Sequence, residues 1–395
     1  MAGSTGSALV ALRTPPGFET AIAIERLWSH GQAVLPVPGG WSEEAVARLL
    51  ELARPHALVD LAGRHPLPDP LPVDPDTALV VATSGATGEP KAVELAHDAL
   101  QASARASLDR LDATEKDRWL CCLPLSHVAG ILVLVRAQLL GTAPILHPRF
   151  DVAAVASEQA ATHVSLVPTM LARLLDAGVA LHRYERVLLG GAAPPPRLLD
   201  RADGAGVRVT LTYGMTETAG GCVYDGEPLD GVEVELREGG RIAVRGPVLM
   251  RGYRAAPAGA APIDADGWLV TPDIGELDSD GRLHVLGRAD DVIVTGGEKV
   301  FAGQLGALLE EHKKVAQAAV VGRPDPEWGE RVVAVCVPAD PARPPTLEEL
   351  RRFVSRRAAS HAAPRDLLLV DELPRTELGK LVRTALPNPD ERIDR

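Results

Sequence analysis

The chain has 395 residues, of which 46% are hydrophobic and 24% charged, and its 37 glycines and 33 prolines are spread along its length. This composition indicates a globular protein of two or three domains, and it excludes a peptide, a disordered chain and a collagen-like repeat. The formal net charge of −12 repels a phosphate backbone and argues against non-specific nucleic-acid binding, while leaving room for a local site for one small anion.

Cysteine use and the N-terminal sequence indicate the compartment. Cys121, Cys122, Cys222 and Cys336 include no C-x-x-C pair and are too few to staple a chain of this length, so a reducing compartment is expected. No basic leader precedes the short apolar stretch at the N-terminus, which argues against a signal or transit peptide. The most apolar segment, 128–146, contains an arginine that would be costly in a bilayer. We expect a cytoplasmic protein without a membrane span.

The pattern between residues 18 and 221 indicates an α/β fold. Short β-branched or apolar runs alternate there with amphipathic stretches, as in a parallel sheet flanked by helices. Strands are predicted at 78–83, 118–124, 163–168, 186–191 and 208–214, and helices at 97–111 and 169–178. The segment 64–76 holds five prolines and predicts an extended surface connector that separates an N-terminal subdomain from the rest.

The pattern of apolar and polar residues changes after residue 222. A β-rich subdomain is predicted there, with two strands around Glu238, Gly239 and Gly240. From about residue 291 a smaller α+β unit follows, with a helix near 298–312, a hairpin around 323–330, and a helix over 346–358 begun by Thr346. We therefore divide the chain into an N-terminal domain over 1–289 and a C-terminal domain over 290–395.

A loop rich in glycine and hydroxyl residues, TSGATGEPKAV, follows the first of these strands at 83–93. Because glycine lets a backbone approach a ligand closely, the loop predicts a phosphate cradle. It is not a Walker A loop, since Pro90 stands where that motif needs glycine and Ala92 where it needs serine or threonine. The candidate phosphate ligands are Thr83, Ser84, Gly85, Thr87, Gly88 and Lys91.

The same loop resembles the phosphate loop of the adenylate-forming superfamily, which includes acyl- and aryl-CoA ligases, luciferases and adenylation domains. Four later segments resemble that family's other motifs in the right order: YGMTETAGG (213–221), TPDIGELDSDG (271–281), GRADDVIVTGGEKV (287–300) and PRTELGK (374–380). The resemblance implies a large N-terminal domain of αβ-layered sheets with a β-rich subdomain, and then a small mobile α+β domain. Ala86 and Ala92 depart from the Thr and Gly more usual in the family, and Ala86 lacks a hydroxyl that could contact phosphate, which implies a slower or weaker ATP step.

The resemblance also implies a reaction: a carboxylate attacks the α-phosphate of ATP, and coenzyme A then takes the acyl group. Thr216 would hydrogen-bond the α-phosphate, Glu217 would hold Mg²⁺, and Lys380 would supply positive charge to the transition state. The other nucleotide-binding residues that match family motifs are Gly190, Gly191, Ala192, Tyr213, Gly214, Asp273 and Arg288. By the same resemblance Gly296 and Gly297 border the pantetheine tunnel, and Asp290 is the hinge of the mobile domain.

The identity of the acid substrate is inferred from a further resemblance. The segments 123–146, 164–175 and 187–202 resemble the o-succinylbenzoate:CoA ligases of menaquinone biosynthesis. That resemblance makes His127 a catalytic-site residue that borders the acyl pocket as a gate. A dicarboxylic acid needs a cationic or hydrogen-bonding site for its non-reacting carboxylate, and Arg136 is a candidate unless it snorkels to the surface. Ser165 and Thr169 are further candidate pocket residues.

Three alternatives stay open. The first two are a CoA ligase for another aryl or medium-chain acid and a stand-alone adenylating enzyme that loads a carrier protein. The third is a nucleotide-binding module without catalysis, against which the joint presence of Thr216, Glu217, Asp273 and Lys380 argues. The expected partners are a small-molecule carboxylic acid, ATP and CoA, with no nucleic acid. A homodimer is expected, although no sustained heptad predicts the interface.

Overall fold

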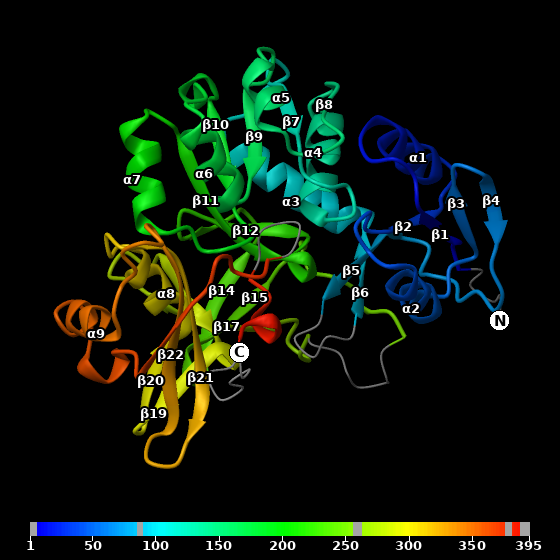
Figure 1. Ribbon diagram of the computed structural model, residues 1–395. Helices are drawn as coiled ribbons and strands as arrows, with labels where there is room; N and C mark the ends of the chain where they lie inside the picture. Colours follow the sequence, from blue (N-terminus) through cyan, green and yellow to red (C-terminus); the bar gives the residue numbers. More distant parts are fainter. Residues whose placement is uncertain (1–5, 85–89, 256–262, 376–380, 388–395) are drawn as a thin grey trace.

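The computed structural model describes residues 6–84, 90–255, 263–375 and 381–387, which form four β-sheets (Figure 1). The N-terminal sheet and its helices are drawn in blue, the second sheet in cyan and green, and the C-terminal unit in yellow and orange. Within the described ranges, no helix has the length and apolar character needed to cross a membrane.

The first sheet has the strand order β16-β6-β5-β2-β1-β3-β4. Its strands and adjoining helices are β1 (Leu9–Leu12), α1 (Phe18–Ser29), β2 (Ala33–Pro36), α2 (Glu43–Ala53), β3 (Ala57–Asp60), β4 (Gly63–Pro66), β5 (Thr77–Ser84), β6 (Pro90–Ala96) and β16 (Gly252–Tyr253). β2 pairs in parallel with β5, and β5 pairs antiparallel with β6. Strands from both sides of the proline-rich connector therefore share one sheet.

The prediction of a separate N-terminal subdomain is thus wrong. The first three residues of the connector belong to β4, and the strands on both sides of it bury one continuous core. Arg254, which is only 5% exposed, holds the connector against this sheet. Its guanidinium donates to the carbonyl oxygen of Leu71 and, at 2.6 Å, to that of Ala53. The same guanidinium lies 2.8 Å from the Glu94 carboxylate of β6.

The second sheet has the order β13-β12-β11-β10-β9-β7-β8. Its elements are α3 (His97–Arg110), β7 (Trp119–Cys121), α4 (Val128–Leu139), β8 (Ile145–Leu146), α5 (Val152–Ser157), β9 (His163–Leu166), α6 (Pro168–Asp176), β10 (Arg186–Leu189), α7 (Pro196–Gly204), β11 (Val209–Met215), β12 (Gly220–Tyr224) and β13 (Glu227–Pro228). β7 to β11 are parallel, as predicted, whereas β12 and β13 add antiparallel strands at one side. Successive residues point to opposite faces, so Trp119 and Leu188 join the core under α3 and α4 while Leu120 and Val187 join the other core.

The third sheet is the predicted β-rich subdomain. It consists of β14 (Glu233–Arg237), β15 (Arg241–Arg245), β17 (Leu269–Leu277) and β18 (Leu283–Arg288). The hairpin predicted around 238–240 is confirmed, since β14 and β15 pair across a turn in which Gly239 and Gly240 both have positive φ.

The C-terminal unit contains the fourth sheet. Its elements are β19 (Val292–Thr295), β20 (Glu298–Phe301), α8 (Ala302–Glu310), β21 (Val315–Asp325), β22 (Gly329–Pro338), α9 (Leu347–Ser355) and β23 (Asp366–Leu369). The predicted hairpin and the helix cap are confirmed, because Thr346 Oγ1 accepts the Glu349 N–H at 3.2 Å. The helix predicted near 298–312 is partly wrong: residues 298–301 form β20, where Val300 is buried opposite Ile293.

Candidate active site

Three of the predicted nucleotide-binding residues, Gly190, Gly191 and Ala192, follow the carboxyl end of β10, the edge of a parallel sheet at which ligands bind. The Gly190 N–H donates to the Leu166 carbonyl at 3.2 Å, and a Cβ on Gly190 would lie 2.2 Å from Thr212 Oγ1. Gly191 has a φ of +82°, and Ala192 after it is exposed. The backbone therefore carries no bulky side chain at this point, so a flat ligand can approach it closely.

The Thr216–Glu217 turn is held in place by hydrogen bonds of a buried threonine, Thr218. β11 leaves its parallel pairing and continues antiparallel to β12, with an irregularity between Tyr213 and Gly214. Thr218, which is fully buried, accepts the Met215 N–H at 2.9 Å and donates to the Gly220 carbonyl at 2.7 Å. These bonds hold the turn, and Thr216 and Glu217 remain half-buried at its surface.

Glu217 is joined to the strand that follows the phosphate loop by Tyr253, a residue that the sequence patterns missed. The Tyr253 hydroxyl donates to Glu217 Oε1 at 2.8 Å, and Lys91 Nζ lies 5.0 Å from the centre of the Tyr253 ring. Burial, together with the Glu217 carboxylate, raises the pKa of Tyr253 far above its usual range, so the phenol keeps its proton. Its position depends on the pairing of β16 with β6, which lie far apart in the chain.

Two further predicted nucleotide-binding residues, Asp273 and Arg288, lie on the third sheet, beside β11. The Tyr213 hydroxyl donates to Asp273 Oδ2 at 2.9 Å, and burial raises the pKa of Tyr213. Asp273 on β17 stands opposite Arg288 on β18. Arg288 itself pairs with Asp290 through two contacts of 2.8 Å, an ion pair that lowers the pKa of Asp290. The structure thus brings Tyr213, Asp273 and Arg288 together.

Three acid-binding candidates lie at the same edge of the second sheet. His127 immediately precedes α4, Ser165 is in β9, and Thr169 is in the first turn of α6. Burial lowers the pKa of His127, which keeps the imidazole neutral near pH 7. This neutral state fits a gate for an apolar acyl group better than a charged contact.

Arg136 lies apart from these residues. It is nine residues beyond His127, about 13 Å along the axis of α4. Its guanidinium carbon lies 4.5 Å from the centre of the Trp119 ring, at the amino end of β7, and the residue is only 4% exposed. Arg136 therefore neither snorkels to the surface nor faces the edge at which the other acid-binding candidates meet.

The remaining predicted residues divide into two groups. Gly296 and Gly297 form the β19–β20 turn, where the Gly296 N–H donates to the Trp328 carbonyl (2.8 Å) at the lower end of the C-terminal unit, away from β11 (Figure 1). Gly85, Thr87, Gly88, Lys380 and the side chain of Ser84 lie outside the described residues, while Thr83 is half-buried at the end of β5. Arg383 Nε lies 2.7 Å from Asp291 Oδ1, next to the predicted hinge.

The acidic residues present fit Mg²⁺ held together with a nucleotide. The described residues contain no group of three or more His, Cys, Asp or Glu that could hold a metal ion alone. Mg²⁺ commonly binds through one or two carboxylates plus substrate phosphates and keeps several waters. Glu217, oriented by Tyr253 and linked through it to the strand after the phosphate loop, supplies one such carboxylate.

Comparisons with known proteins agree with this arrangement. Residues 61–254 match the AMP-binding enzyme family, and residues 305–380 match the AMP-binding enzyme C-terminal domain. A Mycobacterium tuberculosis (strain CDC 1551 / Oshkosh) protein named probable 2-succinylbenzoate–CoA ligase is 45% identical over 327 residues, covering 80% of this chain and 85% of the relative. The 2-succinylbenzoate–CoA ligase of Bacillus subtilis (strain 168) is 34% identical over 78% of this chain and 68% of its own.

A solved structure extends the likeness to nearly the whole chain. The o-succinylbenzoate CoA synthetase of Bacillus subtilis, in complex with the acyl-adenylate intermediate OSB-AMP, superposes with a TM-score of 0.87 at 28% identity, covering 98% of this chain and 90% of that one. This likeness confirms the predicted α/β fold with a small C-terminal α+β unit. The chain belongs to the AMP-binding enzyme family.

Proposed function

We propose that the chain is an AMP-forming acid:CoA ligase that converts o-succinylbenzoate to o-succinylbenzoyl-CoA, a step of menaquinone biosynthesis. The observation that supports the substrate most is 45% identity, over most of both chains, to a relative named for this reaction. ATP, Mg²⁺ and CoA are the other small molecules required, and the Bacillus subtilis relative has a solved structure in complex with ATP and magnesium ion.

The first step joins the acid to AMP. A carboxylate oxygen of the acid bonds to the α-phosphorus while the bond from that phosphorus to the pyrophosphate oxygen breaks. The carboxylate is already ionised at neutral pH, so the protein needs no general base and mainly positions charges. Thr216 donates to the α-phosphate, and Asp273 accepts from the ribose hydroxyls. Arg288 helps to hold the same sugar or the phosphate, and Lys380 offsets the developing negative charge. Mg²⁺, when bound, neutralises phosphate charge, and Glu217 is its protein ligand.

For an in-line displacement, the acid must approach the α-phosphorus from the side opposite the pyrophosphate. His127, Ser165 and Thr169 are the residues that we propose for its pocket, because they share the carboxyl edge of the sheet with Gly190. Arg136 is not included, since it lies at the opposite end of α4 against Trp119.

The second step requires a movement of the C-terminal domain, for which we propose the boundary between residues 289 and 290. The thiol sulfur of CoA attacks the acyl carbon, AMP leaves, and the thiol proton passes to solvent. Gly296 and Gly297 lie away from the site, while Arg383 pairs with Asp291 beside the hinge. A rotation about Asp290 would move the 296–297 turn in and the segment around Lys380 out.

Proline at the hinge is expected to separate the two steps. Asp290→Pro restricts φ at this position and should leave adenylate formation within about twofold, while thioester formation falls at least about tenfold. Asp290→Asn, which weakens the pair with Arg288 but leaves φ free, serves as the control. Single-turnover assays of the two half-reactions measure the split. An equal loss of both in the proline variant would contradict the hinge.

Tyr253→Phe is expected to weaken metal-dependent nucleotide binding. The change removes the hydroxyl that orients Glu217 at 2.8 Å, so the Mg²⁺ concentration for half-maximal ATP binding should rise about tenfold. Calorimetric ATP titrations at stepped Mg²⁺ concentrations give this value without relying on turnover. Tyr184→Phe removes another buried tyrosine hydroxyl, bonded to Arg183, and should leave the midpoint unchanged. An unchanged midpoint in Tyr253→Phe would overturn the role of Tyr253.

The choice of acid and acceptor is tested by one panel. Pyrophosphate release is measured with o-succinylbenzoate, benzoate and octanoate, each with free CoA or with a phosphopantetheinylated carrier protein. A strong preference for o-succinylbenzoate with free CoA is the expected result. Preference for another acid would retain the ligase chemistry and reject the pathway, and preference for the carrier protein would favour a stand-alone adenylating enzyme.

We further propose a cytoplasmic location. Cys121, Cys122, Cys222 and Cys336 are all unpaired and buried, as expected in a reducing compartment, and burial raises the pKa of each thiol to about 12. The homodimer stays a prediction, which the mass from light scattering tests directly.

A further inference from the structure

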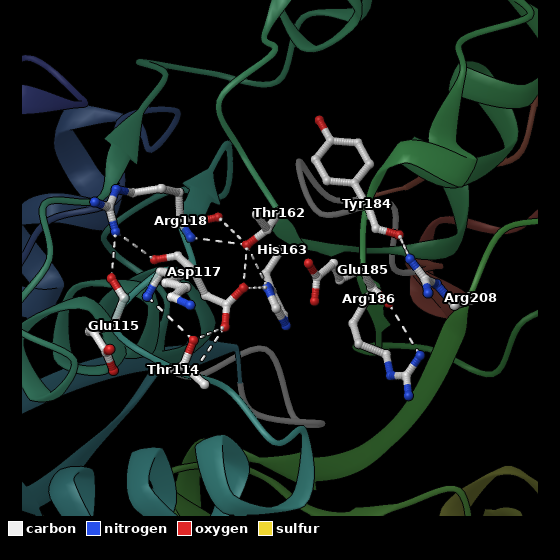
Figure 2. A network of polar contacts seen from close by, with 11 residues as sticks. Thr114, Glu115, Asp117, Arg118, Thr162, His163, Tyr184, Glu185, Arg186 and Arg208 are labelled. Carbon is white, nitrogen blue, oxygen red and sulfur yellow. Dashed lines mark hydrogen bonds and ion pairs between the residues drawn. The ribbon is translucent and has the colours of Figure 1, made fainter.

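Four side chains stand in a row at the amino edge of the second sheet, opposite the candidate active site. Trp119 is paired with His163, and His163 with Arg186, so the three point to the same face. Arg208 lies at the next place in the row, since its carbonyl accepts the Val187 N–H just before β11 begins. Figure 2 shows His163, Arg186 and Arg208 in this arrangement, with the Asp117 carboxylate beside the imidazole. The row combines aromatic rings and two guanidinium groups on the face covered by α3 and α4.

A pocket of about 440 Å³ opens at this end of the row, between the last residues of α3 and the amino ends of β10 and β11. Its polar lining comprises Arg110, Arg186, Arg208, Thr210, Asp203 and Asp225. Arg186 lies at the start of β10, which ends just before Gly190, so the two residues are about 13 Å apart along the strand. The pocket is therefore separate from the candidate nucleotide site.

The two arginines from the row are free of carboxylate partners. The guanidinium of Arg186 donates to the Glu185 carbonyl at 3.2 Å, and that of Arg208 to the Tyr184 carbonyl at 3.3 Å. Across the part of the chain that is described, neither forms an ion pair with a carboxylate, although the protein as a whole is acidic. Their fixed positive charge is thus available to an anion from solution.

The other charges of the pocket are partly engaged. Arg110 lies 3.5 Å from the Glu227 carboxylate and donates to the Pro228 carbonyl at 2.8 Å. Asp225 accepts the Leu211 N–H at 2.7 Å, which holds this carboxylate against the backbone, whereas Asp203 is exposed. Three guanidinium groups therefore face two carboxylates, one of which is oriented by the backbone.

The pKa of His163 indicates that the region next to the pocket is positively charged. Burial lowers the pKa of His163 to about 4; the Asp117 carboxylate opposes this shift, and Arg136, Arg186 and Arg208 add to it. The imidazole is therefore neutral at pH 7 and adds no charge of its own. The guanidinium groups that surround it repel one another, and an anion bound among them would relieve that repulsion.

We infer that this pocket is a second binding site, for a small anion that bears phosphate or carboxylate groups. Arg186 and Arg208 present planar forks suited to two-pronged contact with such oxygens, and Arg110 and the Thr210 hydroxyl line the same space. The volume admits a small metabolite as well as a single phosphate. The inference does not depend on which acid the enzyme activates.

The test uses the full chain with inorganic phosphate as the probe, at saturating AMP so that the candidate nucleotide site is filled. Calorimetry should give saturable binding at one site, with an affinity that falls as salt rises. The double variant Arg186→Gln/Arg208→Gln should bind about tenfold more weakly. Arg105→Gln, which removes one positive charge on α3 outside the pocket lining, should bind as the parent does.

A variant that is expected to tighten phosphate binding, and not to weaken it, keeps the test independent of folding defects. Asp203→Asn removes a carboxylate from the pocket and should tighten phosphate binding about threefold. Thermal unfolding of every variant checks the fold. The absence of saturable binding would overturn the site, as would binding that ignores Asp203→Asn and the double arginine variant. Binding that is lost in Lys91→Gln would assign the phosphate to the nucleotide site and would overturn the inference equally.

Discussion

Glu217→Gln is expected to lower the rate of adenylate formation by about 100-fold or more, because it removes the one negative charge that the Thr216–Glu217 turn offers to a metal ion. Glutamine keeps the shape of the side chain, and its amide oxygen can still accept the Tyr253 hydroxyl that now bonds Oε1 at 2.8 Å. The turn itself rests on Thr218 and stays in place. The loss is therefore electrostatic and not a matter of folding.

Exchange of labelled pyrophosphate into ATP measures this step without the second half-reaction. Excess Mg²⁺ should recover part of the rate in Glu217→Gln, since a weakened metal site fills at higher concentration. Glu238→Gln, on the exposed turn between β14 and β15, is the matched control and should leave exchange unchanged. A Glu217→Gln rate within twofold of the parent would remove Glu217 from the proposed metal site.

Gly214→Ala is expected to abolish adenylation and to lower the free energy of unfolding by about 3 kcal/mol. A Cβ at this position would lie 2.0 Å from the Gly220 carbonyl oxygen and 2.8 Å from two further backbone atoms of β12. Backbone atoms in a paired strand cannot swing away as a side chain can. The strand must therefore separate from β12 just before the Thr216–Glu217 turn, which displaces both side chains.

Gly204→Ala provides the comparison for this prediction. Gly204 lies at the end of α7, where an added Cβ meets no atom within 4 Å, and alanine is the better helix former. Chemical unfolding should show this variant to be at least as stable as the parent. Equal stability of Gly214→Ala and the parent, with adenylation retained, would mean that the close approach of β11 and β12 is not required.

Local pattern predicts those parts of this fold that depend on neighbours in the chain. The hairpin at Gly239–Gly240 and the cap at Thr346 are confirmed because turn and cap chemistry act over a few residues. The subdomain boundary at the proline-rich connector is wrong because sheet pairing between β2 and β5 and the Arg254 contacts join distant segments. The helix predicted from residue 298 begins four residues late, since pairing with β19 overrides helix propensity.

In the candidate site too, local sequence predicts some of the residues, while the roles of others depend on distant contacts. Gly190, Thr216, Glu217 and Asp273 lie in short contiguous motifs, and the structure places them at one edge of the second sheet and on the strand beside it. Thr218 and Tyr253 were missed because their roles depend on a buried turn and on a strand pairing that no local pattern encodes. Arg136 is a candidate from its charge in the sequence, but the direction of α4 across the sheet, which local sequence does not show, places it against Trp119 at the opposite edge.

We propose that the protein activates o-succinylbenzoate as an adenylate before CoA reacts. The most direct measurement mixes enzyme, ATP, Mg²⁺ and o-succinylbenzoate without CoA and analyses the enzyme-bound products by mass spectrometry. We expect one o-succinylbenzoyl-AMP and one pyrophosphate per active site, with conversion to the CoA thioester and AMP when CoA is added. Thioester formation with release of ADP and phosphate, or no adenylate under these conditions, would contradict this proposal.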